Sequence, residues 1–204
     1  LLFTQYILGR VLFPITINKV IMIRIPTDIT KSKNNKRSNI LNMKKIIVIG
    51  CSGSGKTTFA EKLRDKIGIE LFYLDAIWHR PDRTHISREE YDARLSEILA
   101  LDSWIIDGNY SRTIETRMAA CDTVLLFDLP VDVCLEGAIS RLGKARYDMP
   151  WIDTELDPKL KRDIEEFPSK NLPAIYALLD KYSDKNITVF KRREEADEFL
   201  ANIK

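Results

Sequence analysis

Residues 50–57 read Gly-Cys-Ser-Gly-Ser-Gly-Lys-Thr and fit the pattern G-x-x-x-x-G-K-[ST] at every position. Glycines let the backbone turn so that successive N–H groups point into one concavity, and a helix N-terminus adds partial positive charge there. In this pattern the lysine reaches the β- and γ-phosphates of a nucleoside triphosphate, and the threonine ligates Mg²⁺. We therefore predict a site for ATP and Mg²⁺, formed by Gly50, Ser52, Gly53, Ser54, Gly55, Lys56, Thr57 and Thr58.

Two apolar segments end in an aspartate that could share the Mg²⁺ with Thr57. They are 105–107 and 125–128, which end at Asp107 and Asp128. Ligands gather at the carboxyl ends of strands in open α/β sheets, so both aspartates qualify on position. Asp107 leads into a glycine, where the backbone could approach a ligand, whereas Asp128 leads into Leu-Pro and a helix. We predict that Asp107 is the metal ligand and, with Lys56, a catalytic residue.

The stretch "YLDAIWHRPDRT" (73–84) follows the second expected strand and carries candidate acceptor contacts. Asp75 could accept a hydrogen bond from an acceptor hydroxyl, and Trp78 could stack on a base or another flat group. The alternatives are a turn or cap for Asp75 and a packing role for Trp78. His79 and His85 are the only histidines, and because no carboxylate or cysteine grouping marks a metal site, we expect them in surface loops.

Basic residues follow both the Asp107 turn and the fourth expected strand. An arginine fork suits a planar phosphate or carboxylate, so Arg112 is a candidate for binding the acceptor. Arg117 is more simply explained as part of a solvated helix face. Arg141, Lys144 and Arg146 flank an irregular segment, 142–157, that could close over the phosphates as a lid and exclude water. Basic residues also favour helix C-termini for dipole reasons alone, which leaves Lys144 open.

Apolar, β-branched segments alternate with helical patterns along residues 43–204, as expected for a parallel sheet covered on both faces. The fold class is therefore predicted to be α/β, a P-loop NTPase three-layer sandwich with a five-stranded parallel sheet and a short lid insertion. Ser87 and Glu90 form a capping box that should start one helix. The expected strands are 44–49, 70–74, 104–110, 122–130 and 186–191.

Three stretches together resemble the adenylate-kinase-like P-loop kinase family: "IIVIGCSGSGKTT", "WIIDGNYSRT" and "LLFDLPVDVCLEGAISR". The resemblance covers 43–204 and is closest to the bacterial DNA topology modulation (adenylate-kinase-related) proteins. It implies that the third strand lies next to the first, that Arg112 falls near a residue that grips the acceptor, and that Arg141 and Arg146 are lid arginines. It also places the adenine contacts in the turn after "TVFKRRE". The lid has fewer arginines than in many adenylate kinases and no cysteine for a structural zinc.

Residues 1–42 differ from the rest of the chain in charge. They hold seven of the 32 basic residues and one of the 30 acidic ones, so 43–204 carry 25 basic and 29 acidic residues. We expect 1–42 to be an extension outside the domain, either disordered or the product of a start site placed too early. A basic arm that touches nucleic acid or a membrane surface is the alternative. A net acidic body makes nucleic acid an unlikely main partner for 43–204.

The leading hypothesis is a Mg²⁺- and ATP-dependent kinase that acts on a small molecule, a nucleotide or nucleoside. The alternative is an ATP-binding regulator linked to DNA topology, which rests on the basic 1–42 arm. A GTPase is disfavoured because the chain has no Asn-Lys-x-Asp motif, and a transport ATPase because it has no Leu-Ser-Gly-Gly segment. Three cysteines without metal spacing, Cys51, Cys121 and Cys134, fit a reducing cytoplasm. No apolar run is long enough to span a membrane.

Overall fold

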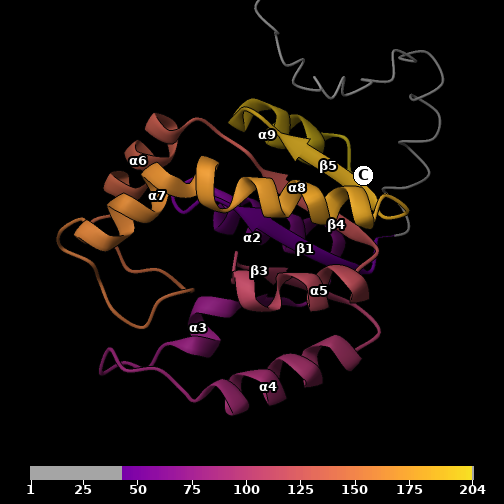
Figure 1. The fold of residues 1–204 in the computed structure, drawn as a ribbon, viewed down its shortest axis with the longest axis horizontal. Helices are drawn as coiled ribbons and strands as arrows, with labels where there is room; N and C mark the ends of the chain where they lie inside the picture. The colour runs from indigo at the N-terminus through magenta and orange to yellow at the C-terminus, as the bar shows by residue number, and fades with distance from the viewer. Residues whose placement is uncertain (1–42, 204) are drawn as a thin grey trace, which may run out of the picture.

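A computed structural model describes residues 43–203, and these build a five-stranded parallel sheet in the order β2-β3-β1-β4-β5 (Figure 1). The predicted fold class is confirmed, and the third strand lies next to the first, as the resemblance implied. The first strand matches its expected range to within one residue at each end, and the other four strands are shorter than expected. Their bounds are β1 Lys45–Gly50, β2 Leu71–Tyr73, β3 Trp104–Asp107, β4 Thr123–Phe127 and β5 Asn186–Phe190.

Helices cover both faces of the sheet. In Figure 1, α5 and α8 lie in front of the strands and α2 lies behind them, while α9 packs against α2. The sequence patterns missed α3, α5 and the 3-10 helix η1, all of seven residues or fewer and therefore too short to show a helical period. The bounds are α2 Lys56–Ile67, α3 Leu74–Trp78, α4 Arg88–Ala100, η1 Ser111–Thr113, α5 Ile114–Ala120, α6 Val131–Ser140, α7 Pro158–Lys170, α8 Leu172–Lys181 and α9 Arg193–Ala201.

Local signals in the sequence explain where several helices begin and end. The Ser87 hydroxyl accepts a hydrogen bond from the backbone N–H of Glu90, so the predicted capping box starts α4. The Asp157 carboxylate caps α7 by accepting from the N–H of Lys159, with Pro158 in the first turn. Gly68 ends α2 in a left-handed conformation at φ 70°.

The sheet and helices bury one core around β1. Residues 46–49 are fully buried between neighbouring strands and the helices on both faces. Phe59 of α2 packs edge-on against Phe127 at the end of β4, with 5.2 Å between ring centroids. Because β3 and β4 flank β1 in register, Val48 pairs with Asp107 and Gly50 pairs with Phe127. This register brings the end of β3 directly beside the loop that follows β1.

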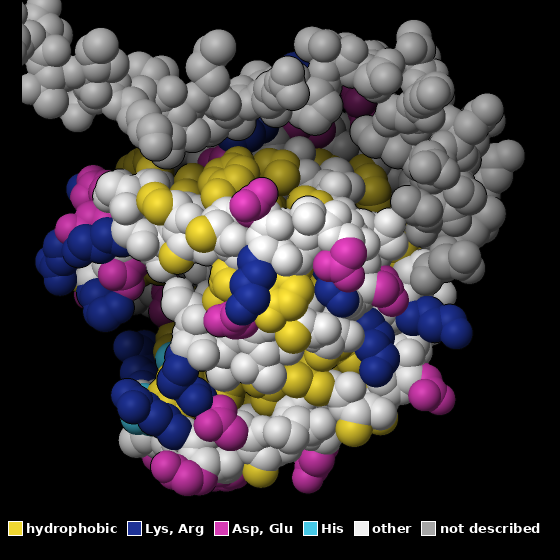
Figure 2. All heavy atoms as spheres, turned by 45° about the vertical axis from the view of Figure 1, so that its right-hand side comes forward, with side chains coloured by type: hydrophobic (Ala, Val, Ile, Leu, Met, Phe, Trp, Pro, Cys, Tyr) yellow, Lys and Arg dark blue, Asp and Glu magenta, His cyan; other side chains and the backbone are white. Residues whose placement is uncertain are grey.

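The connection between α6 and α7, residues 141–157, contains no helix or strand and projects from the sheet on the left of Figure 1. This connection includes residues 142–157, which the sequence predicted as a lid, and we call residues 141–157 the lid segment. The expectations for 1–42, including the basic arm, concern residues outside the described range. Within 43–203, no helix combines the length and apolar character needed to cross a membrane. On the face in Figure 2, basic and acidic side chains of the described residues are interspersed rather than separated by sign.

Candidate active site

The loop between β1 and α2 forms a tight cradle that only glycine can build at two of its positions. Gly50 and Gly53 have φ angles of 138° and 79°, in the left-handed range. A Cβ on Gly50 would lie 2.3 Å from the carbonyl oxygen of Phe127, and one on Gly53 would lie 2.0 Å from that of Cys134. The neighbouring β4 and α6 therefore press against the loop, and side chains at these positions would displace it.

Lys56 and Ser54 hold the inside of this loop. The Lys56 ammonium donates a hydrogen bond to the Cys51 carbonyl oxygen at 2.7 Å, and the buried Ser54 hydroxyl donates to the same oxygen at 2.7 Å. The backbone N–H of Gly50 donates to the Asn109 side-chain oxygen, which ties the loop to the residues after β3. Lys56 is thus folded back into the concavity where phosphate oxygens would compete for its protons.

Thr57 and Asp107 meet at the foot of the loop. The Thr57 hydroxyl donates to Asp107 Oδ2 at 2.6 Å, while the buried Asp107 Oδ1 has no hydrogen-bond partner among the described residues. Burial raises the pKa of Asp107 from 3.8 to about 6, against the opposing effect of Lys56. A hydroxyl beside a buried carboxylate with an unused oxygen fits a Mg²⁺ site. Mg²⁺ takes one or two protein ligands plus substrate phosphates, so the lack of a larger acidic metal cluster among residues 43–203 is compatible with it.

Asp128, the other strand-end aspartate, is engaged elsewhere. Its carboxylate accepts from the Tyr176 hydroxyl at 2.6 Å and pairs with the Lys191 ammonium. These partners come from α8 and from the turn after β5, which hold Asp128 away from Thr57. Although β3 and β4 both flank β1, the Thr57 hydroxyl therefore hydrogen-bonds Asp107 rather than Asp128.

Two cavities open onto this loop. The first, which we call the P-loop cavity, has a volume of about 510 Å³ and is lined by residues 53–58 of the loop and α2, by the start of α9 and by the lid segment. The second, the Asp75 cavity, has a volume of about 780 Å³ and lies between Asp75, the 107–111 turn, the lid segment and α7. Gly50 and Ser52 line the Asp75 cavity, whereas Gly53, Ser54, Gly55 and Thr58 line the P-loop cavity. Lys56, Thr57, Arg141, Arg146 and Asp148 line both.

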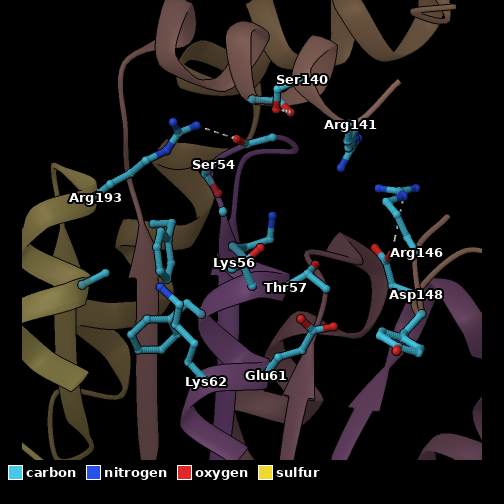
Figure 3. A pocket seen from close by; sticks show the side chains of 18 of the residues that line it. Ser54, Lys56, Thr57, Glu61, Lys62, Ser140, Arg141, Arg146, Asp148 and Arg193 are labelled. Carbon is cyan, nitrogen blue, oxygen red and sulfur yellow. Dashed lines mark hydrogen bonds and ion pairs between the residues drawn. The ribbon is translucent and has the colours of Figure 1, made fainter. Parts of the chain in front are cut away.

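The lid segment brings Arg141 and Arg146 to the junction of the two cavities (Figure 3). Arg146 lies near two lid carboxylates, with Nε 3.6 Å from Asp148 Oδ1 and one terminal nitrogen 3.7 Å from Asp153 Oδ2. Burial and the neighbouring Arg146 lower the pKa of Arg141. Lys144 lines the P-loop cavity only. Both predicted lid arginines therefore face the space above Lys56.

Asp75 lies in the first turn of α3 rather than in a loop, and its side chain borders the second cavity. Its Oδ1 accepts a hydrogen bond from the Tyr110 hydroxyl at 2.9 Å. That bond joins α3 to the turn after Asp107. The carboxylate is held in place by a neutral hydroxyl, so it keeps its capacity to accept a hydrogen bond from a ligand.

The structure does not bring Trp78 to either cavity. Its ring stacks on His85 at 4.5 Å between centroids and meets Tyr91 edge-on at 5.6 Å, so Trp78 packs within an aromatic cluster. Trp151, which the sequence patterns did not single out because it lies in the irregular lid segment, lines the Asp75 cavity instead. It contacts His79 edge-on at 5.1 Å, and His79, expected on the surface, is partly buried at the same cavity. Burial lowers the pKa of His79.

Arg112 also lies outside both cavities. Its two terminal nitrogens bind the Asp92 carboxylate of α4 at 2.9 Å and 2.7 Å, and its guanidinium lies over the Tyr91 ring. The spacing after Asp107 suggested a fork for the acceptor, but η1 turns the side chain toward α4. The structure therefore places Arg112 apart from Asp75 and the other candidate residues that line the two cavities.

Arg117, expected on a solvated helix face, is fully buried. Its guanidinium donates to the carbonyl oxygens of Gly108 and Tyr110, each at 2.9 Å, and so braces the turn that carries Asn109 and Tyr110. Burial lowers the pKa of Arg117 to about 10. A single sequence cannot distinguish this arginine from an exposed one, because the burial depends on where α5 packs.

Replacing Arg117 by lysine will weaken this turn, because one ammonium group cannot reproduce the fork that binds two carbonyl oxygens. We expect the free energy of unfolding to fall by about 1–3 kcal/mol, from the unsatisfied carbonyl. Denaturant unfolding measures the effect. The matched control is Arg112→Lys, whose parent side chain is exposed and pairs with Asp92; it should cost under about 1 kcal/mol. Equal losses in the two variants would contradict the bracing role.

Arg193 is a further residue at the site that sequence reasoning reached only through the analogy for the turn after β5. Its guanidinium donates to the carbonyl oxygens of Gly53 at 3.2 Å and Val133 at 3.1 Å. It lines the P-loop cavity beside α6. The cysteines are free and buried, and Cys51 contributes a small side chain under the loop.

A scan against protein-family models and a search of curated proteins gave no match. Three solved structures show weak similarity. A sugar kinase from Janibacter sp. HTCC2649 has 18% identity over 78% of this chain and 91% of its own, with a TM-score of 0.45. A shikimate kinase from Bacteroides thetaiotaomicron has 16% identity, covering 78% and 95%, with a TM-score of 0.48. A gluconokinase from Sinorhizobium meliloti 1021 has 14% identity, covering 78% and 91%, with a TM-score of 0.47.

Proposed function

We propose that this chain is an ATP- and Mg²⁺-dependent phosphotransferase that moves the γ-phosphoryl group to a hydroxyl of a small molecule in the cytoplasm. The observation that carries the proposal is the junction of two cavities at one set of cationic and hydroxyl side chains. Lys56, Thr57, Arg141 and Arg146 border both the P-loop cavity and the Asp75 cavity. A triphosphate in the first would end where an acceptor in the second begins.

The residues at the junction suit the charge changes of phosphoryl transfer. The bond between the γ-phosphorus and the oxygen of the ADP leaving group breaks while the acceptor oxygen forms a new bond to phosphorus. The Asp75 carboxylate, lining the acceptor side, would accept the proton of the hydroxyl. Lys56, Arg141 and Arg146 would neutralise charge on the transferring group, which is where most catalysis of this reaction arises.

Thr57 and Asp107 would hold the Mg²⁺. When bound, the ion would offset the negative charge of the phosphate groups. The lid segment would keep water from competing with the acceptor hydroxyl, which requires it to close over both cavities. The sequence favoured a nucleotide or nucleoside as acceptor. The alternative, a regulator linked to DNA topology, rests on the basic arm at 1–42, outside the described residues.

The test is coupled ADP release by the full chain with Mg²⁺–ATP and a panel of hydroxyl compounds. We expect one acceptor class to stimulate ADP release strongly, and Asp75→Asn to lower the stimulated rate by a factor on the order of 10² to 10⁴. The control is Asp184→Asn, since Asp184 is exposed and lies outside both cavities. Slow ADP release that is indifferent to every acceptor would overturn the proposal.

A further inference from the structure

The two cavities differ in the sign of their charge. Six cationic side chains and three carboxylates line the P-loop cavity, which suits a triphosphate; the cations are Lys56, Lys62, Arg141, Lys144, Arg146 and Arg193. The Asp75 cavity is the reverse, with four cations and seven carboxylates. Its carboxylates are Asp75, Asp107 and five from the lid segment and α7: Asp148, Asp153, Glu155, Asp157 and Asp163.

Three of the four cations of the Asp75 cavity also line the P-loop cavity, and the fourth is in an ion pair. Lys56, Arg141 and Arg146 are shared with the P-loop cavity, where they would face the phosphates of ATP. The fourth cation, Lys159, pairs with Asp163 at 2.5 Å, one turn along α7. Among the lining residues of this cavity, none therefore supplies a spare positive charge for an anionic group on the acceptor.

The arginines next to the cavity do not supply a free positive charge for an anionic acceptor either. Arg112 is held by the Asp92 carboxylate, and Arg117 is buried against the carbonyl oxygens of Gly108 and Tyr110. Proteins that recognise a phosphate or carboxylate do so with charge-assisted, often bidentate, arginine contacts. Apart from Arg141 and Arg146, which it shares with the P-loop cavity, the Asp75 cavity has no arginine in its lining, so it disfavours nucleotides, sugar acids and other anionic acceptors.

Asp148, which lines both cavities, carries a buried carboxylate oxygen that could bind a cationic group of a ligand. Only 4% of the residue is exposed, and its Oδ1 has no hydrogen-bond partner among the described residues. The nearest positive charge is Arg146 Nε at 3.6 Å, beyond hydrogen-bond distance (Figure 3). Burial raises the pKa of Asp148 against the effect of that arginine. A buried carboxylate oxygen without a donor costs free energy, and a ligand that donates to it would recover this cost.

We propose that the acceptor is a hydroxyl compound that carries an ammonium group and no phosphate or carboxylate, such as an amino alcohol or an amino sugar. Asp148 binds the ammonium group and Asp75 takes the reacting hydroxyl, while the phosphoryl transfer itself is the step described above. The inference rests on the proposed function and narrows its acceptor. Neutral nucleosides would be weaker acceptors, and nucleotides would be excluded by charge.

The experiment compares acceptors that share a skeleton and differ in charge, using the full chain and Mg²⁺–ATP. One set is 2-amino-1,3-propanediol, glycerol and glycerate; the second is glucosamine, glucose and glucuronate; the third is adenosine and its 5′-monophosphate. We expect kcat/KM to fall by about tenfold from the amine to the neutral compound, which corresponds to about 1.4 kcal/mol, and further for the acid. A higher kcat/KM for the acid or the monophosphate would overturn the inference.

Asp148→Asn keeps the size of the side chain and removes its charge. We expect the ratio of kcat/KM for the amine to that for its neutral partner to fall about tenfold in this variant, while Asp184→Asn keeps the wild-type ratio. Thermal unfolding of both variants checks that they fold. An unchanged ratio in a folded Asp148→Asn protein would overturn the assignment of Asp148.

Binding separates this inference from the proposed function. The thermal shift of the full chain is measured with the same compounds and a non-hydrolysable ATP analogue. Stabilisation by the amines without any turnover would refute the phosphotransferase and keep the binding specificity. Turnover with stronger binding of the acids would keep the phosphotransferase and refute the specificity. Neither binding nor turnover with any compound would refute both.

Discussion

Lys56→Ala will lower the rate of phosphoryl transfer by a factor on the order of 10³, the effect of removing a preorganised group that stabilises charge in the transition state. Lys56 is largely buried, and its ammonium occupies the concavity of the loop through a bond to the Cys51 carbonyl oxygen. No other cationic residue lies within the loop, residues 50–57, so no side chain of the loop itself can replace its charge.

The fold should survive this change. The Cys51 carbonyl oxygen keeps two donors, the Ser54 hydroxyl and the Ser54 backbone N–H, so no acceptor is left unsatisfied. An assay of ADP release measures the loss of phosphoryl transfer, and thermal unfolding measures whether the fold is retained. Lys181→Ala is the control, since Lys181 is exposed, pairs with Glu115 and lies outside both cavities. Wild-type turnover in Lys56→Ala would remove the basis for the ATP site.

Asp107→Asn will lower activity and stabilise the metal-free protein. Loss of the carboxylate removes a Mg²⁺ ligand, and we expect a rate decrease on the order of 10² to 10³. Burial raises the pKa of Asp107 from 3.8 to about 6, so the folded protein holds this proton more tightly than the unfolded chain. Two pKa units correspond to about 3 kcal/mol, which is the expected stability difference at pH 8.

The pH dependence follows from the direction of that shift. The contribution of Asp107 to stability is fully present below about pH 4 and is lost as the pH rises through about 6. Thermal unfolding without Mg²⁺ at pH 5 and pH 8 should show this loss in the wild-type chain and a smaller one in Asp107→Asn. Asp128→Asn is the control, because Asp128 pairs with Lys191; it should keep activity without a gain in stability. If Asp107→Asn is less stable than the wild-type protein at pH 8, the buried carboxylate does not destabilise the fold and the prediction is wrong.

Activity should also fall on the acid side of about pH 6, since a protonated Asp107 cannot bind Mg²⁺. Raising the Mg²⁺ concentration should move this limit to lower pH, because metal and proton compete for the same oxygens. This competition distinguishes Asp107 from the other acids of the site, none of which contacts Thr57 among the described side chains.

The sequence could identify the parts of the site that lie within one continuous stretch. The loop at 50–57 has its lysine, threonine and glycines in fixed positions, and the strand before it and the helix after it orient them without help from distant residues. The alternation of strands with helices and the Ser87–Glu90 capping box could be predicted for the same reason, because they depend on local spacing and local hydrogen bonds.

The acceptor side depended on packing that no local pattern encodes. Arg112 and Arg117 lie five residues apart, yet one pairs with Asp92 at the surface and the other is buried under the Gly108 carbonyl oxygen. Trp78, predicted as a candidate acceptor contact, stacks on His85 in the structure. Trp151, for which the sequence predicted no role, lines the Asp75 cavity because the lid segment places it there.

By itself, the sequence determined the α/β class and the phosphate-binding loop, since both follow from the period of apolar residues and from backbone geometry. It favoured Asp107 over Asp128 as the metal ligand, but β3 and β4 both flank β1. What separates the two aspartates is their contacts, because Asp107 bonds Thr57 whereas Asp128 bonds Tyr176 and Lys191. Only the tertiary structure showed that the second cavity is acidic. Its carboxylates come from α3, β3, the lid segment and α7, and a charge shared among such distant segments appears only when the chain folds.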